Sequence, residues 1–579
     1  MAIPIHDNSS QENSWTIRRI ASALSVNAIA AASLCLAAGL PAHAQTAATA
    51  AAPAAAPTAA QGVKPAAASS QTLAALPKTK EDGTFFPSHY RQVLKAPLPN
   101  LIFKHKQLPT VIDELFFAES TTGTIAAFQP AGPTATATNA FFESLGTNGR
   151  TCFTCHQPAT GMSISVEHIR EVFHSTGGTD PLFAPVDGAT CPKNVPAAST
   201  SGALVGGHLG KGQGTLEDAY KTVLERGLIR VFNPIPVDAD YTIEVVSDPY
   251  GCNTDPEFNS EVDSNNVTRQ IVSVYRRPRI SASLLFAVSA APAAATPPAT
   301  PETGNGSGNI MWDGREPFLE HQVIDATLGH AQATSAPTAD QIQQIVGFET
   351  GIYSAQSRTP GAGELTAHDA LGGPVVLASE TPGQRSTTPF TLYTTWQSPP
   401  KLLEHAAFRE SVARGEKIFN TKNFVISNDA GLNPLPPAAP KNITGPCATC
   451  HSQHFIGYDS FPNAQQDQGI GGDSASLGGP APSAFLPIFK VTCKPGAPTG
   501  FHGSVIMTND PGKAIISGKC ADTGKFTVPQ LRALAPRAPF FSDGSAATLL
   551  DVVNFYDKRF AINLTAAEKK DLVNFLSAL

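Results

Sequence analysis

The sequence predicts a mainly α-helical fold, on the strength of two helical patterns and a scarcity of strand patterns. Between Leu402 and Phe419 the apolar residues recur at helical spacing and form one stripe. From Asn563 onward a second helix is expected, where Thr565 caps the first turn and Glu568 completes a capping box. Strand-like alternation is rare and short, so we expect helices joined by long loops. The buried face of the last helix is expected to be Leu572, Phe575, Leu576 and Leu579.

Residues 1–44 have the parts of a secretion signal. Arg18 and Arg19 supply positive charge, residues 20–40 are apolar and rich in alanine, and Ala42-His43-Ala44 matches a cleavage site. Small residues dominate the apolar run and the cleavage site follows at once. We therefore expect cleavage near Ala44 and export to the periplasm, rather than a retained membrane anchor. No stable membrane insertion is expected after cleavage.

The remaining chain divides by composition. Residues 45–80 are rich in Ala and Pro and predict a disordered linker. The 579 residues leave room for two further domains, which we place at 81–400 and 401–579. Turn signals crowd residues 175–255 and predict a loop-rich insertion in the first domain. The formal charge of −7, without a basic block, makes nucleic acid an unexpected partner.

Two pentapeptides carry the chemistry. They are Cys152-Phe153-Thr154-Cys155-His156 and Cys447-Ala448-Thr449-Cys450-His451. In a C-x-x-C-H motif the two thiols add to the haem vinyl groups and the adjacent His ligates the iron. A zinc clip would need further Cys or His at finger spacing, and a redox dithiol does not need the trailing His. The sequence therefore predicts two covalently bound haem c groups, with His156 and His451 as iron ligands.

The other cysteines suit an oxidising compartment. Of nine cysteines, Cys35 lies in the expected signal and four belong to the haem motifs. We expect the remaining four to pair as Cys191–Cys252 and Cys493–Cys520, because each pair lies on one side of the second motif. Four free thiols are the alternative.

Further sequence blocks resemble the bacterial di-haem cytochrome c peroxidase and MauG superfamily. They are Met311-Trp312-Asp313-Gly314-Arg315 with Leu319-Glu320-His321-Gln322, the segment 526–532 with 538–545, and the segment 548–557. The resemblance implies two cytochrome c-like domains with one haem each. It also implies that the first haem meets peroxide and that the second is six-coordinate and passes electrons.

Candidate catalytic residues follow from this resemblance. Trp312 matches the family's bridging Trp, and Gln322 matches its distal-pocket Gln; an ordinary core Trp and a solvent-facing Gln are the alternatives. The family's Glu, about ten residues beyond that Gln, has no counterpart in Leu328-Gly329-His330-Ala331-Gln332. His330 is therefore the candidate general base. The lost carboxylate leaves dioxygen open as the oxidant in place of peroxide.

The resemblance also places Tyr556 at the sixth ligand of the second haem, where short peroxidases have Met and MauG enzymes have Tyr. Simple packing of Tyr556 on a helix is the alternative. The family often binds calcium between its domains. The Asn that contributes to that site is replaced near Arg277-Pro278-Arg279, so calcium is left open.

Taken together, these patterns predict a periplasmic di-haem c-type oxidoreductase that reduces hydrogen peroxide and receives electrons from a small redox protein. One alternative is a di-haem dioxygenase resembling the rubber-cleaving enzymes. Another is an electron-transfer cytochrome without catalytic activity.

Overall fold

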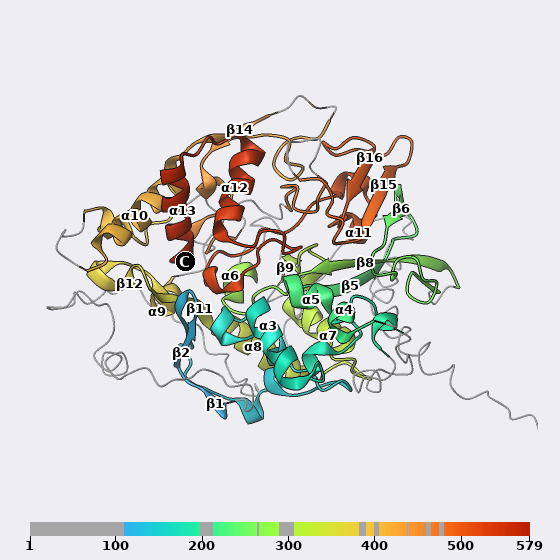
Figure 1. Cartoon of the computed structure of the whole chain (residues 1–579), viewed down its shortest axis with the longest axis horizontal. Coiled ribbons are helices and arrows are strands. Elements are labelled where there is room, and N and C mark those ends of the chain that lie inside the picture. Colours follow the sequence, from blue (N-terminus) through green and yellow to red (C-terminus); the bar gives the residue numbers. More distant parts are fainter. Residues whose placement is uncertain are drawn as a thin grey trace, which may run out of the picture. The chain divides into compact units, whose positions relative to one another are not determined.

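The computed structural model describes residues 109–196, 212, 214–262, 266–288, 306–380, 389–398, 404–436, 438, 441–453, 456–458, 465–473 and 480–579 (Figure 1). The expected signal, its cleavage near Ala44 and the linker lie outside these residues. All described residues belong to one contact-defined unit, Gly83–Leu579. Among the described helices, none is long and apolar enough to cross a membrane.

The prediction of a mainly α-helical fold is wrong. Of the described chain, 34% is helical and 20% is strand, and the strands form several antiparallel sheets. The missed signal is clear in residues 241–247, where Tyr241, Ile243 and Val245 are more buried than the side chains between them. That alternation has the period of two expected of a strand with one covered face. Such short strands are stabilised by partners far away in sequence, which a local pattern does not reveal.

The strands are β1 (Val111–Ile112), β2 (Leu115–Ser120), β3 (Gly123–Phe128), β4 (Thr134–Ala135), β5 (Ile229–Pro234), β6 (Tyr241–Ser247), β7 (Ser260–Val262), β8 (Thr268–Arg276), β9 (Gly306–Ile310), β10 (Glu316–Phe318), β11 (Tyr353–Thr359), β12 (Gly363–Glu364), β13 (Phe424–Ile426), β14 (Ile443–Gly445), β15 (Ile488–Cys493) and β16 (Val505–Thr508). The larger sheets have the orders β12-β11-β3-β2, β5-β8-β7 and β16-β15-β6.

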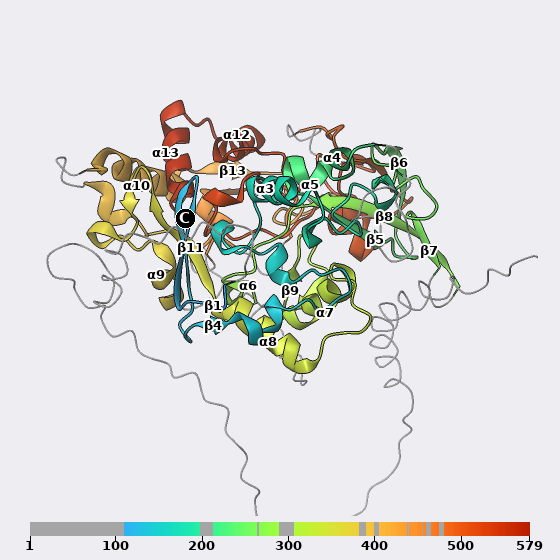
Figure 2. The same ribbon diagram turned by 60° about the horizontal axis from the view of Figure 1, so that its bottom comes forward.

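The helices are α3 (Val166–Thr176), α4 (Leu216–Ala219), α5 (Lys221–Arg226), α6 (Leu284–Val288), α7 (Leu319–Gly329), α8 (Ala339–Gly351), α9 (Gly373–Ser379), α10 (Ala406–Thr421), α11 (Ala514–Ser517), α12 (Leu549–Phe560) and α13 (Ala566–Ser577). Figure 2 shows α12 and α13 next to each other near the C-terminus.

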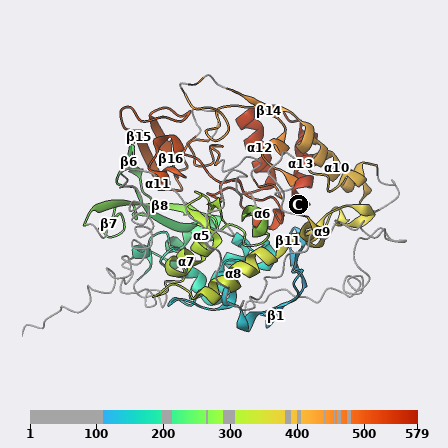
Figure 3. The same cartoon turned by 180° about the vertical axis from the view of Figure 1, so that it is seen from behind.

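One sheet joins distant parts of the chain. Strand β6 lies in the stretch expected to be an insertion. It pairs antiparallel with β15, so that Tyr241 lies opposite Cys493 and Ser247 lies opposite Ile488. An ion pair between Glu244 and Lys490 adds to this pairing. Figure 3 shows β6 beside β15 and β16 from the rear. The insertion is therefore not self-contained, because its strand completes a sheet with the C-terminal part of the chain.

Two helix predictions are confirmed. The helix predicted over Leu402 to Phe419 corresponds to α10, which runs from Ala406 to Thr421. Leu402 and Leu403 lie outside the described residues. Helix α13 begins after Thr565, whose hydroxyl accepts from the Glu568 N–H in the predicted capping box. Its predicted apolar face is buried, with Phe575 fully so. Helix α13 packs on α10 at Gly415, where a Cβ atom would collide with the carbonyl of Asp571.

Both predicted disulfides are confirmed. Cys191 is bonded to Cys252 with 5.4 Å between their Cα atoms, and Cys493 is bonded to Cys520 with 5.5 Å. The second bond links the end of β15 to the turn after α11. Closing such loops stabilises a fold by about 3–4 kcal/mol each, chiefly by restricting the unfolded chain.

Candidate functional site

The two C-x-x-C-H motifs fold into the same local structure. Each begins with a single 3-10 turn, Cys152–Thr154 in the first and Cys447–Thr449 in the second. In both, the backbone N–H of the His donates to the carbonyl of the first Cys at 3.1 Å. This turn brings both thiols and the imidazole of one motif to a shared site. All four thiols are outside the disulfides.

The two histidines are also oriented alike. The Nδ1 atom of His156 lies 3.0 Å from the Met162 carbonyl oxygen, and Nδ1 of His451 lies 2.7 Å from that of Gly457. A carbonyl only accepts hydrogen bonds, so Nδ1 carries the proton and Nε2 keeps its lone pair. This second hydrogen bond is the usual way in which a metal-ligating His is held.

Burial keeps both imidazoles neutral. Burial lowers the pKa of His156 to about 4, and nearby His330 lowers it further by a smaller amount. The hydrogen bond to the Met162 carbonyl acts in the opposite direction. Burial also lowers the pKa of His451, against the effect of the Gly457 carbonyl. A neutral imidazole with a free Nε2 is the form that binds a metal ion.

A cavity of about 200 Å³ opens at the second motif. Cys447, Cys450 and His451 line it, together with Trp312 and Tyr556. Most of the wall is apolar and includes Phe419, Phe424, Ile426, Leu531, Leu572 and Leu576. Two thiols, one oriented imidazole and an apolar wall fit a covalently bound haem c. Tyr556 extends into this wall from α12, and burial raises the pKa of its hydroxyl.

A buried ion-pair chain lies beside the first motif. The Arg150 guanidinium pairs with Asp187, and the same carboxylate contacts Nδ1 of His330. Burial opposes ionisation of Asp187, yet the charge of Arg150 and the contact with His330 hold its pKa below the usual range. His330 follows α7 and its side chain is 35% exposed. It thus forms an Asp–His pair, which the sequence did not predict because Asp187 lies far away along the chain.

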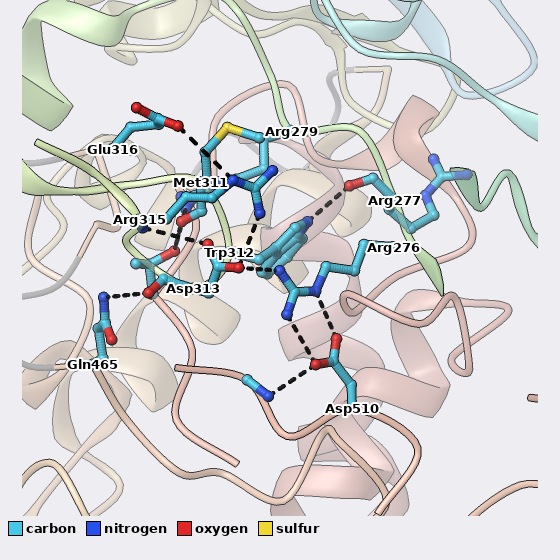
Figure 4. A network of polar contacts seen from close by, with 12 residues as sticks. Arg276, Arg277, Arg279, Met311, Trp312, Asp313, Arg315, Glu316, Gln465 and Asp510 are labelled. Atoms are coloured by element: carbon cyan, nitrogen blue, oxygen red, sulfur yellow. Dashed lines mark hydrogen bonds and ion pairs between the residues drawn. The ribbon is translucent and has the colours of Figure 1, made fainter. Parts of the chain in front are cut away.

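Trp312 lines the cavity of the second motif, and Figure 4 shows its ring among the side chains of Arg276, Arg277, Arg279 and Asp313. Its indole N–H donates to the Arg277 carbonyl at 2.7 Å, and the Arg279 guanidinium lies 5.2 Å from its ring. The carbonyl of Pro278, the residue after Arg277, accepts a hydrogen bond at 3.1 Å from the hydroxyl of Ser163, which follows the first motif. The segment for which calcium was left open therefore carries two buried guanidinium groups, those of Arg277 and Arg279.

The residue after Trp312 anchors this segment. Asp313 is fully buried and pairs with Arg276 and, at 2.9 Å, with Arg315 (Figure 4). Arg276 also pairs with Asp510 at 2.6 Å. Burial alone would raise the pKa of Asp313, but the two guanidinium groups lower it to about 2. The W-D-G-R block thus positions Trp312 through charges from distant segments.

The predicted residues do not all meet. Trp312, Tyr556 and the second motif share one cavity, whereas His330 lies with Asp187 beside the first motif. Gln322 is half-buried on α7 and is not part of the cavity wall. Sequence reasoning missed Glu349, a buried residue of α8. Its Oε2 accepts no hydrogen bond, and burial raises its pKa to about 8 despite a hydrogen bond from Ser281.

Glu349→Gln is expected to weaken the dependence of stability on pH. The folded state keeps the Glu349 proton up to about pH 8, whereas the unfolded chain loses it near 4.5. Stability is therefore lost as pH rises through this window, by up to about 4 kcal/mol. Urea unfolding at pH 5 and pH 8 measures the effect. Glu143→Gln, on an exposed side chain, is the control. Equal pH dependence in Glu349→Gln and the unsubstituted protein would contradict the assignment.

The comparisons with known proteins give short matches. No family model matches the chain. Cytochrome-c peroxidase IdrP2 of Denitromonas iodatirespirans is 37% identical over 90 residues, which is 14% of this chain and 24% of the relative. Cytochrome-c peroxidase IdrP1 of the same organism is 41% identical over 69 residues, 10% of this chain and 18% of the relative. The chain thus matches under a quarter of either relative's length.

Among solved structures, a MauG-like protein associated with microbial copper homeostasis is 18% identical, with a TM-score of 0.27 over 55% of this chain and 76% of that one. The sequence matches support a distant relationship to the di-haem cytochrome c peroxidases at the level of the superfamily. At the same level, these matches suggest a di-haem oxidoreductase.

Proposed function

We propose that this chain is a periplasmic di-haem c-type oxidoreductase that reduces hydrogen peroxide with electrons from a small redox protein. The observation that carries the proposal is the matched geometry of the two C-x-x-C-H turns, each with an imidazole held by a backbone carbonyl. When bound, haem c supplies the iron that exchanges electrons and acts on the oxygen–oxygen bond. The short matches to cytochrome-c peroxidases support this class of reaction.

The chain's own residues would hold and orient these groups. Cys152 and Cys155 would attach the first haem, and Cys447 and Cys450 the second, by thioether bonds. His156 and His451 would each present Nε2 to the metal, because their Nδ1 protons are engaged by carbonyls. The apolar wall around the second motif would exclude water from that site.

His330 is the candidate for proton transfer. Asp187 holds its Nδ1–H, which leaves Nε2 as the nitrogen that can take a proton from peroxide and return it to the leaving oxygen. A buried carboxylate orienting an imidazole is the arrangement that general bases use elsewhere. His330 therefore replaces, in this proposal, the carboxylate that the sequence lacks at Gln332.

Trp312→Phe is expected to leave both haems bound and to slow electron transfer between them. The variant also loses the hydrogen bond to the Arg277 carbonyl, at a cost of about 1–3 kcal/mol. Stopped-flow absorption after one-electron reduction measures the transfer. Trp396→Phe is a matched control, because Trp396 is buried, donates to the Ala367 carbonyl at 2.8 Å and lies 5.3 Å from the Arg409 guanidinium. Equal rates in the two variants would refute a bridging role.

Tyr556→Phe tests the proposed sixth ligand of the second haem. If the phenolate is a ligand, the variant loses the low-spin spectrum of that haem, and its reduction potential rises because a hard oxygen ligand stabilises the ferric state. Electron paramagnetic resonance and a redox titration measure both changes. Tyr250→Phe, which removes a hydroxyl bound to the Phe485 carbonyl, is the control. An unchanged spectrum removes Tyr556 from the ligand set.

The proposed function is tested by adding stoichiometric hydrogen peroxide to the reduced, haem-loaded chain. Consumption of one peroxide with oxidation of both haems is expected. Haems that fail to respond to peroxide or cyanide would instead favour an electron-transfer cytochrome. One observation favours the dioxygenase alternative: the amide Gln332, which contacts Asn148, stands where the resemblance implies a carboxylate. A stable complex with dioxygen and cleavage of an apolar polyene would decide for that alternative.

A further inference from the structure

A second cluster of metal-binding side chains lies outside both haem motifs. Asp467, Asp473 and His502 each offer one possible ligand atom, and these atoms all lie within 4.8 Å of one another. Both Asp side chains are fully buried, and that of His502 is 2% exposed. Two carboxylate oxygens and one imidazole nitrogen form a compact donor set.

Asp473 gives a second, independent indication of a ligand. Both of its carboxylate oxygens are buried, and neither accepts a hydrogen bond from another residue. A buried carboxylate left without such partners is costly, and native proteins almost always supply a partner or a metal ion. Gly524 faces this carboxylate, and a Cβ atom at that position would collide with Oδ2 of Asp473. Glycine at position 524 thus lets the backbone lie close to a carboxylate that accepts no hydrogen bond.

Among the described residues, no cationic group lies within hydrogen-bond distance of Asp473. His502 Nε2 is 2.5 Å from Asp467 but 4.0 Å from Asp473. Arg559 donates to the Ser427 and Asn428 carbonyls. The other charged groups that face the cluster, Asp429 and Asp510, are acidic. Four carboxyl groups, those of Asp429, Asp467, Asp473 and Asp510, therefore lie near one imidazole and one guanidinium group.

We propose that Asp467, Asp473 and His502 bind one divalent transition-metal ion of the zinc class. Imidazole together with carboxylate favours ions such as Zn²⁺ over Mg²⁺ and Ca²⁺, which prefer oxygen ligands alone. On binding, Nε2 of His502 exchanges its contact with Asp467 for the metal, and a proton held by the cluster is released to solvent. This site is independent of the proposed oxidoreductase function.

The site would join segments that are distant in sequence. Asp467 lies between Gln466 and Gln468, both of which line the cavity of the second motif. His502 lies in the turn between β15 and β16, and this hairpin is also held by the Cys493–Cys520 disulfide. A bound ion would fix the hairpin turn against the wall of the cavity. The expected role is structural, because the ligands are buried and do not line the cavity themselves.

Zinc binding to the haem-loaded, full-length chain tests this proposal. After treatment with a chelator and dialysis against Zn²⁺, elemental analysis is expected to find one zinc per chain beside two irons. Asp473→Asn and His502→Gln are expected to weaken binding at least about tenfold in a calorimetric titration, which corresponds to losing one ligand of the set. The matched controls are Asp238→Asn and His174→Gln, which alter exposed side chains and are expected to bind zinc normally.

Zinc X-ray absorption on the unsubstituted chain gives a test that does not depend on the folding of any variant. One nitrogen and at least two oxygen neighbours at about 2.0–2.2 Å are expected. Three results would overturn the proposal: no retained zinc, equal zinc affinity in His502→Gln and the unsubstituted chain, or tighter binding of Ca²⁺ than of Zn²⁺. A sulfur-rich zinc environment would likewise overturn it.

Discussion

Replacing Cys447 and Cys450 together with Ser is expected to lower the haem content from two per chain to one and to destabilise the fold. Both thiols line the cavity of the second motif, whose wall is largely apolar. Without covalent attachment the cavity of about 200 Å³ has no permanent occupant. Loss of the group that covers this apolar wall is therefore expected to lower the temperature of unfolding.

A pyridine haemochrome assay with protein quantitation measures the haem content, and thermal unfolding measures stability. Thr449→Ser keeps both thiols and is the control within the same turn. Cys152→Ser with Cys155→Ser is expected to remove the other haem, so the two double variants together identify each group. Two haems in either double variant, or one haem in the unsubstituted chain, would refute the assignment of two attachment sites.

Arg276→Met is expected to destabilise the fold by more than Trp312→Phe does. Arg276 is 3% exposed and neutralises both Asp313 and Asp510. Removing its charge leaves two buried carboxylates short of a partner, and breaking such a pair typically costs about 3–5 kcal/mol. Asp313 retains Arg315, so Asp510 carries most of this penalty. Trp312 is the neighbour of Asp313, and we expect its environment to change as well.

Urea unfolding followed by tryptophan fluorescence measures both effects. Arg269→Met is a matched control on the same strand β8, because Arg269 is 25% exposed and its ion pair with Glu261 is 3.9 Å long. Arg269 also donates to the Ile235 carbonyl at 3.4 Å, and we expect the loss of these long contacts to cost about 1 kcal/mol. Similar losses in the two variants would show that the Arg276 cluster has no special part in the fold. Replacing Asp510 with Asn in the Arg276→Met background is expected to recover part of the loss.

Local patterns predicted those parts of the structure that depend on local chemistry. The capping box before α13 was predictable because its two residues lie three positions apart. The two disulfides were predictable because only four cysteines remained to be paired. The shared geometry of His156 and His451 follows from a five-residue motif and a carbonyl six residues later. Predicting these features requires no knowledge of the contacts made by residues far away in the sequence.

The rest depends on contacts that no local pattern encodes. Asp187 reaches His330, and Asp510 reaches Arg276, only because separate loops meet in the folded chain. Glu349 looks like an ordinary helix residue until its burial is known. The error in fold class has the same origin, since the strand pairing of β6 is with a segment near the other end of the chain.

The partnership of β6 with β15 has a consequence for how the polypeptide is made. Synthesis proceeds from the N-terminus, so β6 exists for some time before the ribosome has produced Cys493. Until then its edge offers unpaired backbone groups to any other nascent chain, which is a known route to aggregation. We expect a chaperone to keep this segment unpaired until the chain has been exported and β15 is available. A fragment ending near residue 400 is expected to be insoluble for the same reason.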